Sequence, residues 1–113
     1  MSRYTFLLLT NLAFADNGSL LFNGNCATCH FTDKASSAPT IHQVRQRYLK
    51  AFPDKKDFVE YMSNWVVKPN KETSLMHDMI DKYGLMPELG YDKSTLKEIT
   101  TYIYKGDIKA TTK

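Results

Sequence analysis

The sequence predicts an all-α fold of four to five short helices. Apolar residues recur every three or four positions in the segments 40–52, 54–68 and 92–106, which is the period of an amphipathic helix. Proline or glycine stands between these segments, where a helix ends or the chain turns. The β-branched and aromatic residues at 100–104 favour a strand by composition, but their spacing is helical, so we expect a helix there as well.

The length and composition indicate one small globular domain. The chain has 113 residues, of which 42% are hydrophobic and 24% charged. It is too short for an enzyme with separate cofactor and substrate domains, and no apolar run reaches the roughly 18 residues that cross a bilayer. The formal charge is +3 and the basic residues are scattered. We therefore expect neither a permanent membrane span nor a nucleic acid as partner.

The first fifteen residues have the outline of a secretory signal peptide. Arg3 is their only charge, an apolar stretch begins at Phe6, and residues 13–15 form an A-x-A cleavage site. We expect a signal peptide at 1–15 and a single mature domain at 16–113, with a short disordered tail after about residue 106. A buried N-terminal helix and an uncleaved anchor are the alternatives. Export would place both cysteines outside the reducing cytosol.

Two shorter elements complete the predicted fold. Residues 18–25, which include Leu21 and Phe22, form a short helix soon after the expected cleavage site. Residues 74–82 form one or two helical turns. The segment 84–91 contains two glycines and a proline and is predicted to be a loop.

Residues 26–30 read C-x-x-C-H and include both cysteines of the chain. Two thiols three positions apart, at the end of a short helix, can add to the two vinyl groups along one edge of a haem. This attachment would hold the adjacent histidine under the iron as an axial ligand. We therefore expect one covalently bound haem c, with Cys26 and Cys29 as thioethers and His30 as the proximal iron ligand.

Three other kinds of site contain this residue set. A thioredoxin-like dithiol normally lies in a βαβ unit, which the helical pattern does not provide. A zinc site would need four ligands, and His42 or His77 would have to complete it at a spacing unlike that of known fingers. A disulfide between Cys26 and Cys29 would close too small a loop to stabilise the fold much.

The distal iron ligand is predicted to be Met86. It lies in Gly84-Leu85-Met86-Pro87, where glycine and proline can bend the backbone over a flat cofactor. A methionine in a loop can be aimed at the iron by the backbone, whereas one on a helix face is more often core packing. The alternative distal ligands are Met76, Met79, His42 and His77.

Together these residues resemble the small single-haem class I cytochromes c of bacterial periplasms. The resemblance covers about residues 17–106. It is based on Leu21-Phe22 before the C-x-x-C-H motif, Ala38-Pro39-Thr40, Met86-Pro87 and the helix at 96–103. The segment 71–83 is longer here than in the most compact members of that family.

The resemblance implies a class I cytochrome c fold, in which the first and last helices cross and pack around one covalent haem. It implies contact between Phe22 and Tyr102 at this crossing. It also implies that the Pro39 carbonyl accepts a hydrogen bond from His30, which would orient the ligand and raise its basicity. Trp65 matches an aromatic residue near the haem propionates, with packing against the haem or the core as the alternative.

The implied function is that of a periplasmic one-electron carrier rather than an enzyme, because two protein ligands leave no open position on the iron. The implied partners are redox proteins, with a dehydrogenase as donor and an oxidase or peroxidase as acceptor. Two alternatives remain: a haem subunit bound tightly to a periplasmic dehydrogenase, for example one for sulfite or another small anion, and a haem-based sensor. Candidates for a basic rim that steers partners are Lys34, Lys55, Lys56 and Lys82.

Overall fold

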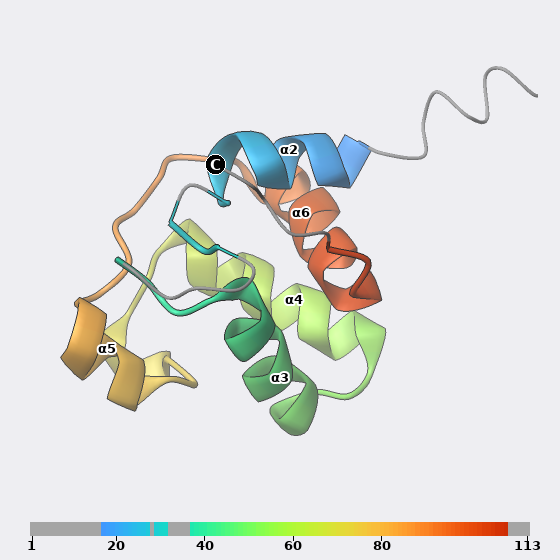
Figure 1. The fold of residues 1–113 in the computed structure, drawn as a ribbon. Coiled ribbons are helices and arrows are strands. Elements are labelled where there is room, and N and C mark those ends of the chain that lie inside the picture. The colour runs from blue at the N-terminus through green and yellow to red at the C-terminus, as the bar shows by residue number, and fades with distance from the viewer. Residues whose placement is uncertain (1–16, 28, 32–36, 109–113) are drawn as a thin grey trace, which may run out of the picture.

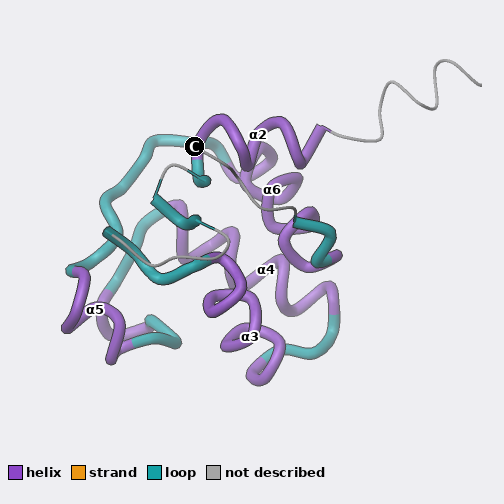
Figure 2. The backbone as a smooth tube through the Cα atoms, viewed as in Figure 1, coloured by secondary structure: helices purple, strands orange, loops and turns teal. Residues whose placement is uncertain are grey.

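The computed structural model describes residues 17–27, 29–31 and 37–108, and within these ranges every regular element is a helix (Figures 1 and 2). The predicted all-α fold is confirmed. In chain order the elements are α2 (Asn17–Asn25), α3 (Ile41–Ala51), α4 (Lys55–Val67), the 3-10 helix η1 (Lys71–Thr73), α5 (His77–Tyr83) and α6 (Lys93–Lys105). In this part of the chain, no helix has both the length and the apolar character needed to cross a bilayer. The expected signal peptide and Lys34 lie outside the described residues.

The first and last described helices, α2 and α6, cross at Gly18 (Figure 1). A Cβ atom at Gly18 would lie 2.7 Å from the Glu98 carbonyl oxygen and 2.9 Å from the Tyr102 Cβ, so a larger residue would push the helices apart. One turn further, the rings of Phe22 and Tyr102 pack with their centroids 5.6 Å apart. The predicted crossing is thus present, and it sets the end of α2 against α6.

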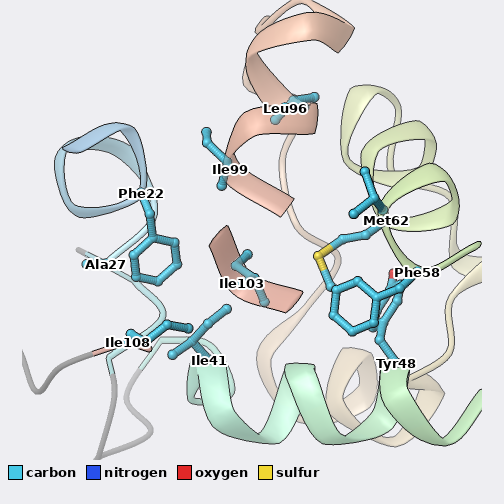
Figure 3. Close-up of a cluster of buried hydrophobic side chains, with 11 residues drawn as sticks. Phe22, Ala27, Ile41, Tyr48, Phe58, Met62, Leu96, Ile99, Ile103 and Ile108 are labelled. Atoms are coloured by element: carbon cyan, nitrogen blue, oxygen red, sulfur yellow. The ribbon is translucent and has the colours of Figure 1, made fainter. Parts of the chain in front are cut away.

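The hydrophobic core lies where α4 and α6 pack along each other, and α2 and α3 close it from the sides (Figure 3). Most of its members come from the apolar stripes that the helical period predicts; Ala27, Val59 and Ile108 are additional members. The buried side chains in these stripes are Phe22, Ile41, Tyr48, Phe58, Met62, Leu96, Ile99 and Ile103. Their burial holds the four helices in one unit, because apolar area removed from water is the main favourable term in folding.

Two hydroxyls in this core are not revealed by the apolar pattern. Ser63 on α4 and Thr100 on α6 are 0% and 1% exposed, and their oxygens lie 3.2 Å apart. Ser63 donates to the Val59 carbonyl, and Thr100 donates to the Ser63 oxygen or to the Lys97 carbonyl at 3.3 Å. The pair therefore satisfies its own hydrogen bonds between two helices, as buried polar groups must.

Helix α6 ends at Gly106, as predicted. Gly106 has φ 81°, in the left-handed region, and its amide donates to the Ile103 carbonyl at 3.1 Å. The guanidinium of Arg45, on α3, donates to the Ile103 and Tyr104 carbonyls at 3.0 Å each. Ile108, two residues beyond Gly106, is buried in the core, whereas residues 109–113, which make up most of the expected tail, lie outside the described residues.

The segment between α4 and α6 follows the prediction in outline. The turns expected at 74–82 are α5, and residues 84–92 contain no helix. The 3-10 helix η1 is not evident from the sequence pattern. It begins where the Asn70 side chain accepts a hydrogen bond from the Glu72 amide at 2.8 Å, which is a local capping interaction.

The ion pair between Glu60 on α4 and Lys93 on α6 predicts a pH dependence. The Glu60 carboxylate accepts from the Lys93 ammonium at 2.7 Å, and this bond, with one from Asn64, lowers the pKa of Glu60 from 4.5 to about 2. A depressed pKa stabilises the folded state above the unfolded value and loses this contribution as pH falls toward 2. We expect the thermal midpoint of a Glu60→Gln variant to depend less on pH than the wild-type midpoint between about pH 5 and pH 2. Parallel curves for the two proteins would contradict this assignment.

Candidate haem site

An apolar cavity of about 240 Å³ opens between the core helices and the segment 74–89. Tyr83, Gly84 and the residues around them form one wall, and the core helices form the other walls. The side chains that the core helices contribute are Phe22 and Asn25 of α2, Ile41, Val44 and Tyr48 of α3, Met62, Trp65 and Val66 of α4, and Leu96, Ile99, Thr100 and Ile103 of α6. Such a lining suits a large, flat, mostly apolar group.

The described residues of the C-x-x-C-H motif form a tight turn that lines this cavity. The Cys26 amide donates to the Phe22 carbonyl at 2.8 Å, which continues the helical pattern past the end of α2. The amides of Cys29 and His30 both donate to the Cys26 carbonyl, at 3.2 and 2.9 Å. Both cysteines and the histidine line the cavity, and the two thiols are not joined in a disulfide. Local backbone hydrogen bonds thus bring two thiols and one imidazole to the same cavity wall.

The imidazole of His30 is oriented by Pro39. Its Nδ1 lies 2.9 Å from the Pro39 carbonyl oxygen, and because a carbonyl only accepts, Nδ1 holds the proton. Burial lowers the pKa of His30, and this effect outweighs the hydrogen bond to Pro39, which raises it. The ring is therefore neutral at pH 7 and leaves Nε2 as the nitrogen that can bind a metal.

Pro39 is itself held by the start of α3. The Thr40 hydroxyl accepts from the Gln43 amide at 3.1 Å, and the Gln43 side chain accepts from the Thr40 amide at 2.9 Å, which together form a capping box. The Ile41 amide donates to the Phe31 carbonyl at 2.9 Å, directly after the motif. The helix start and the C-x-x-C-H turn are thereby tied together on either side of the His30–Pro39 bond.

The pKa of the Cys26 thiol is shifted in the opposite direction to that of a redox-active dithiol. Burial, and to a lesser extent the charge of Cys29, raises the pKa of Cys26 to about 11. Reactive cysteines in dithiol oxidoreductases have depressed pKa values, because the thiolate is the nucleophile. Among the described residues, no three side chains of His, Cys, Asp or Glu come together as a set that could hold a metal ion. Two thiols and one imidazole in a cavity with apolar walls are the groups that would hold a haem.

Four methionines line the cavity, so their burial does not identify one distal ligand. Met86 lies in the non-helical segment after Gly84 and is half-buried. Met76 is buried directly before α5, Met79 lies on α5, and Met62 belongs to the core. The alternative histidines are elsewhere: His42 and His77 are both exposed and neither lines the cavity.

Trp65 lines the cavity, but its indole N–H is used within the protein. It donates to the Asn70 carbonyl at 3.0 Å, just beyond the end of α4. This bond fixes the ring at the cavity wall and leaves its apolar surface to pack against an occupant.

The described lysines of the expected basic rim lie on two different helices, α4 and α5. Lys55 and Lys56 begin α4, whereas the residues of α4 that line the cavity come from its second half. Lys82 is close to the cavity, with its ammonium 5.3 Å from the ring centroid of Tyr83. Within the described part of the chain, the structure does not gather these lysines into one patch.

The wall formed by α5 contains two residues that the sequence reasoning missed, Ile80 and Tyr83. Together with Met76 and Met79 they have the i, i+3, i+4, i+7 spacing of an amphipathic helix. The signal was therefore present in the sequence, but it extended over only two helical turns. Thr100 was also missed, because a hydroxyl within an apolar stripe gives no signal of its own.

Comparison with known proteins agrees with this site. The model of the cytochrome c family matches residues 15–106, a range that includes the C-x-x-C-H turn, the cavity and Met86. No curated protein and no solved structure matches this chain significantly. The chain therefore belongs to the cytochrome c family, whose members bind haem c covalently and transfer electrons.

Proposed function

We propose that this protein is a periplasmic one-electron carrier with a single haem c and His/Met ligation. Cys26 and Cys29 would form the thioethers, and His30 and Met86 would bind the iron. The observation that supports this most directly is the convergence on one apolar cavity of the C-x-x-C-H turn, the Pro39-oriented imidazole and the segment with Met86.

The residues at the site would each have a defined task. Haem, when bound, supplies an iron that takes up and releases one electron. The Pro39 carbonyl orients His30 and raises its basicity, while the thioether of Met86 favours the reduced state. The apolar walls would exclude water, and Trp65, which lines the cavity, would pack its ring against a bound haem. Because both axial positions would be filled by protein, no position remains for a substrate.

Family membership implies redox partners, and the surface beside Met86 is suited to brief contact with them. Leu85 and Leu89 line the cavity and are 45% and 40% exposed, so they form a small apolar patch at its rim. Electron-transfer encounters have small interfaces of this kind. We propose a dehydrogenase as donor and an oxidase or peroxidase as acceptor. Stable co-purification with a catalytic subunit would instead favour the fixed dehydrogenase subunit.

The visible absorption spectrum of the matured protein tests the proposal. We expect a covalent low-spin haem with a methionine–iron charge-transfer band in the ferric state, and no spectral change when carbon monoxide is added to the ferrous state. A high-spin haem that binds carbon monoxide would contradict the His/Met ligation and favour a sensor. Absence of haem after expression in cells able to attach it would refute the function and favour thiol or zinc chemistry.

A further inference from the structure

Helix α5 forms a wall of the cavity but has little attachment to the core. It has seven residues, none of them buried, and no side-chain cap at its start. Its close helical neighbour is η1, while Met79, Ile80 and Tyr83 line the cavity. A helix this short is not stable on its own. Its position must therefore depend on the occupant of the cavity and on specific polar contacts.

Arg47 provides the polar contact between α5 and the core helices. Its guanidinium donates to both carboxylate oxygens of Asp78, at 2.9 and 2.6 Å, and to the Leu75 carbonyl at 3.3 Å. Two parallel bonds to one carboxylate fix the orientation of the partner as well as its distance. Arg47 lies on α3, the helix that contributes Ile41 and Tyr48 to the cavity lining.

The other anchors hold the chain before α5 rather than α5 itself. The Tyr61 hydroxyl donates to the Thr73 carbonyl at 2.5 Å, and the Trp65 indole donates to the Asn70 carbonyl at 3.0 Å. Among the described residues, Arg47 is the side chain from another helix that hydrogen-bonds to α5. Without the two Arg47–Asp78 hydrogen bonds, which we call the Arg47 fork, α5 keeps its contact with η1 but loses its polar link to α3.

The orientation of α5 also determines where the segment with Met86 begins. The Gly84 amide donates to the Ile80 carbonyl at 2.7 Å, so the first residue after α5 is fixed to the helix. Met86 follows two residues later. A shift of α5 would therefore move the point from which Met86 reaches the iron.

We propose that Arg47 is a positioning residue for the distal side of the haem. Its fork holds α5, and with it the Met86 segment, in the place from which the thioether can stay on the iron. The inference rests on the proposed His30/Met86 ligation. Arg47 does not line the cavity, so it acts through the residues to which it donates, Asp78 on α5 and Leu75 just before it.

Ligand exchange in the ferric holoprotein tests the inference. Imidazole binds only after the distal ligand has left, so its binding rate reports how often Met86 is displaced. We expect this rate to rise about three- to tenfold in Arg47→Gln and in Asp78→Asn, because a bidentate charged hydrogen bond is stronger than an ordinary surface ion pair. Arg47→Lys, which keeps the charge without the fork, is expected to give a smaller increase.

The control is an ion pair of similar exposure that is remote from the cavity. Glu60 and Lys93 join α4 to α6 at 2.7 Å, and neither lines the cavity. Glu60→Gln is expected to leave the imidazole rate within a factor of two of wild type. The inference is overturned if Arg47→Gln matches the wild-type rate, or if Glu60→Gln raises the rate equally.

A second measurement separates this inference from the proposed ligation. If no methionine is the distal ligand, wild-type protein binds imidazole rapidly and its ferric spectrum lacks the methionine band, before any variant is compared. If another methionine is the ligand, Met86→Ala keeps the band. Amide hydrogen exchange then tests the fork directly. The Ile80 and Gly84 amides should exchange three- to tenfold faster in Arg47→Gln while amides of α6 are unchanged. Equal protection in both proteins overturns the role of Arg47.

Discussion

Met86→Ala is expected to convert the haem from low-spin to high-spin, to abolish the methionine–iron band and to allow carbon monoxide to bind the ferrous state. The variant removes the proposed thioether while leaving the C-x-x-C-H turn and the His30–Pro39 bond in place. Loss of a ligand that favours the reduced state is also expected to lower the reduction potential by on the order of 0.1 V. Absorption spectroscopy with carbon monoxide, followed by a potentiometric titration, measures both effects.

Met79→Ala is the matched control for this variant. Met79 also lines the cavity, but from α5, and the same truncation removes the same volume. Its spectrum is expected to keep the methionine band and to remain insensitive to carbon monoxide. If Met79→Ala loses the band while Met86→Ala keeps it, Met79 is the ligand and the assignment of Met86 is wrong.

Gly18→Ala is expected to lower the free energy of unfolding of the holoprotein by about 2–3 kcal/mol. The added methyl group would lie 2.7 Å from the Glu98 carbonyl oxygen and 2.9 Å from the Tyr102 Cβ. These atoms belong to the backbone of α6 or lie next to it, so they cannot move aside as the end of a long side chain could. The helices must separate, and the Phe22–Tyr102 contact must loosen with them.

Gly24 in the same helix provides the control. No atom lies within 4 Å of the position that its Cβ would occupy. Gly24→Ala is therefore expected to leave stability unchanged or to raise it by up to about 1 kcal/mol, because alanine favours a helix over glycine. Guanidinium denaturation of both holoproteins measures the difference. Equal stability of the two variants would contradict the close helix crossing.

Much of the fold could be predicted because its signals are local. The apolar stripes of α3, α4 and α6 follow from the spacing of residues within each helix, and the ends at Pro53 and Gly106 follow from backbone chemistry. The C-x-x-C-H turn is local as well, since the backbone hydrogen bonds that shape it join residues within five positions. The pairing of α2 with α6 was expected from the family resemblance rather than from periodicity.

The polar residues that escaped prediction depend on partners that are distant in the sequence. Arg47 and Asp78 lie 31 positions apart, and Ser63 and Thr100 lie 37 apart. Each of these side chains has an unremarkable place in its own helix, and only the packing of one helix against another gives it a partner. The placement of Lys55 and Lys56 on one helix and Lys82 on another has the same origin. The sequence spacing of residues on different helices does not indicate whether they lie on the same surface of the protein.

The sequence by itself determined the helical segments, their breaks and the thiol–imidazole motif, because each depends on backbone geometry over a few residues. Only the tertiary structure decided which side chains enclose the cavity and what holds its walls. Those outcomes depend on contacts between α2 and α6, α3 and α5, and α4 and α6. Such contacts form when apolar surfaces from separate helices are buried together, and a local sequence pattern does not specify the partner of each surface.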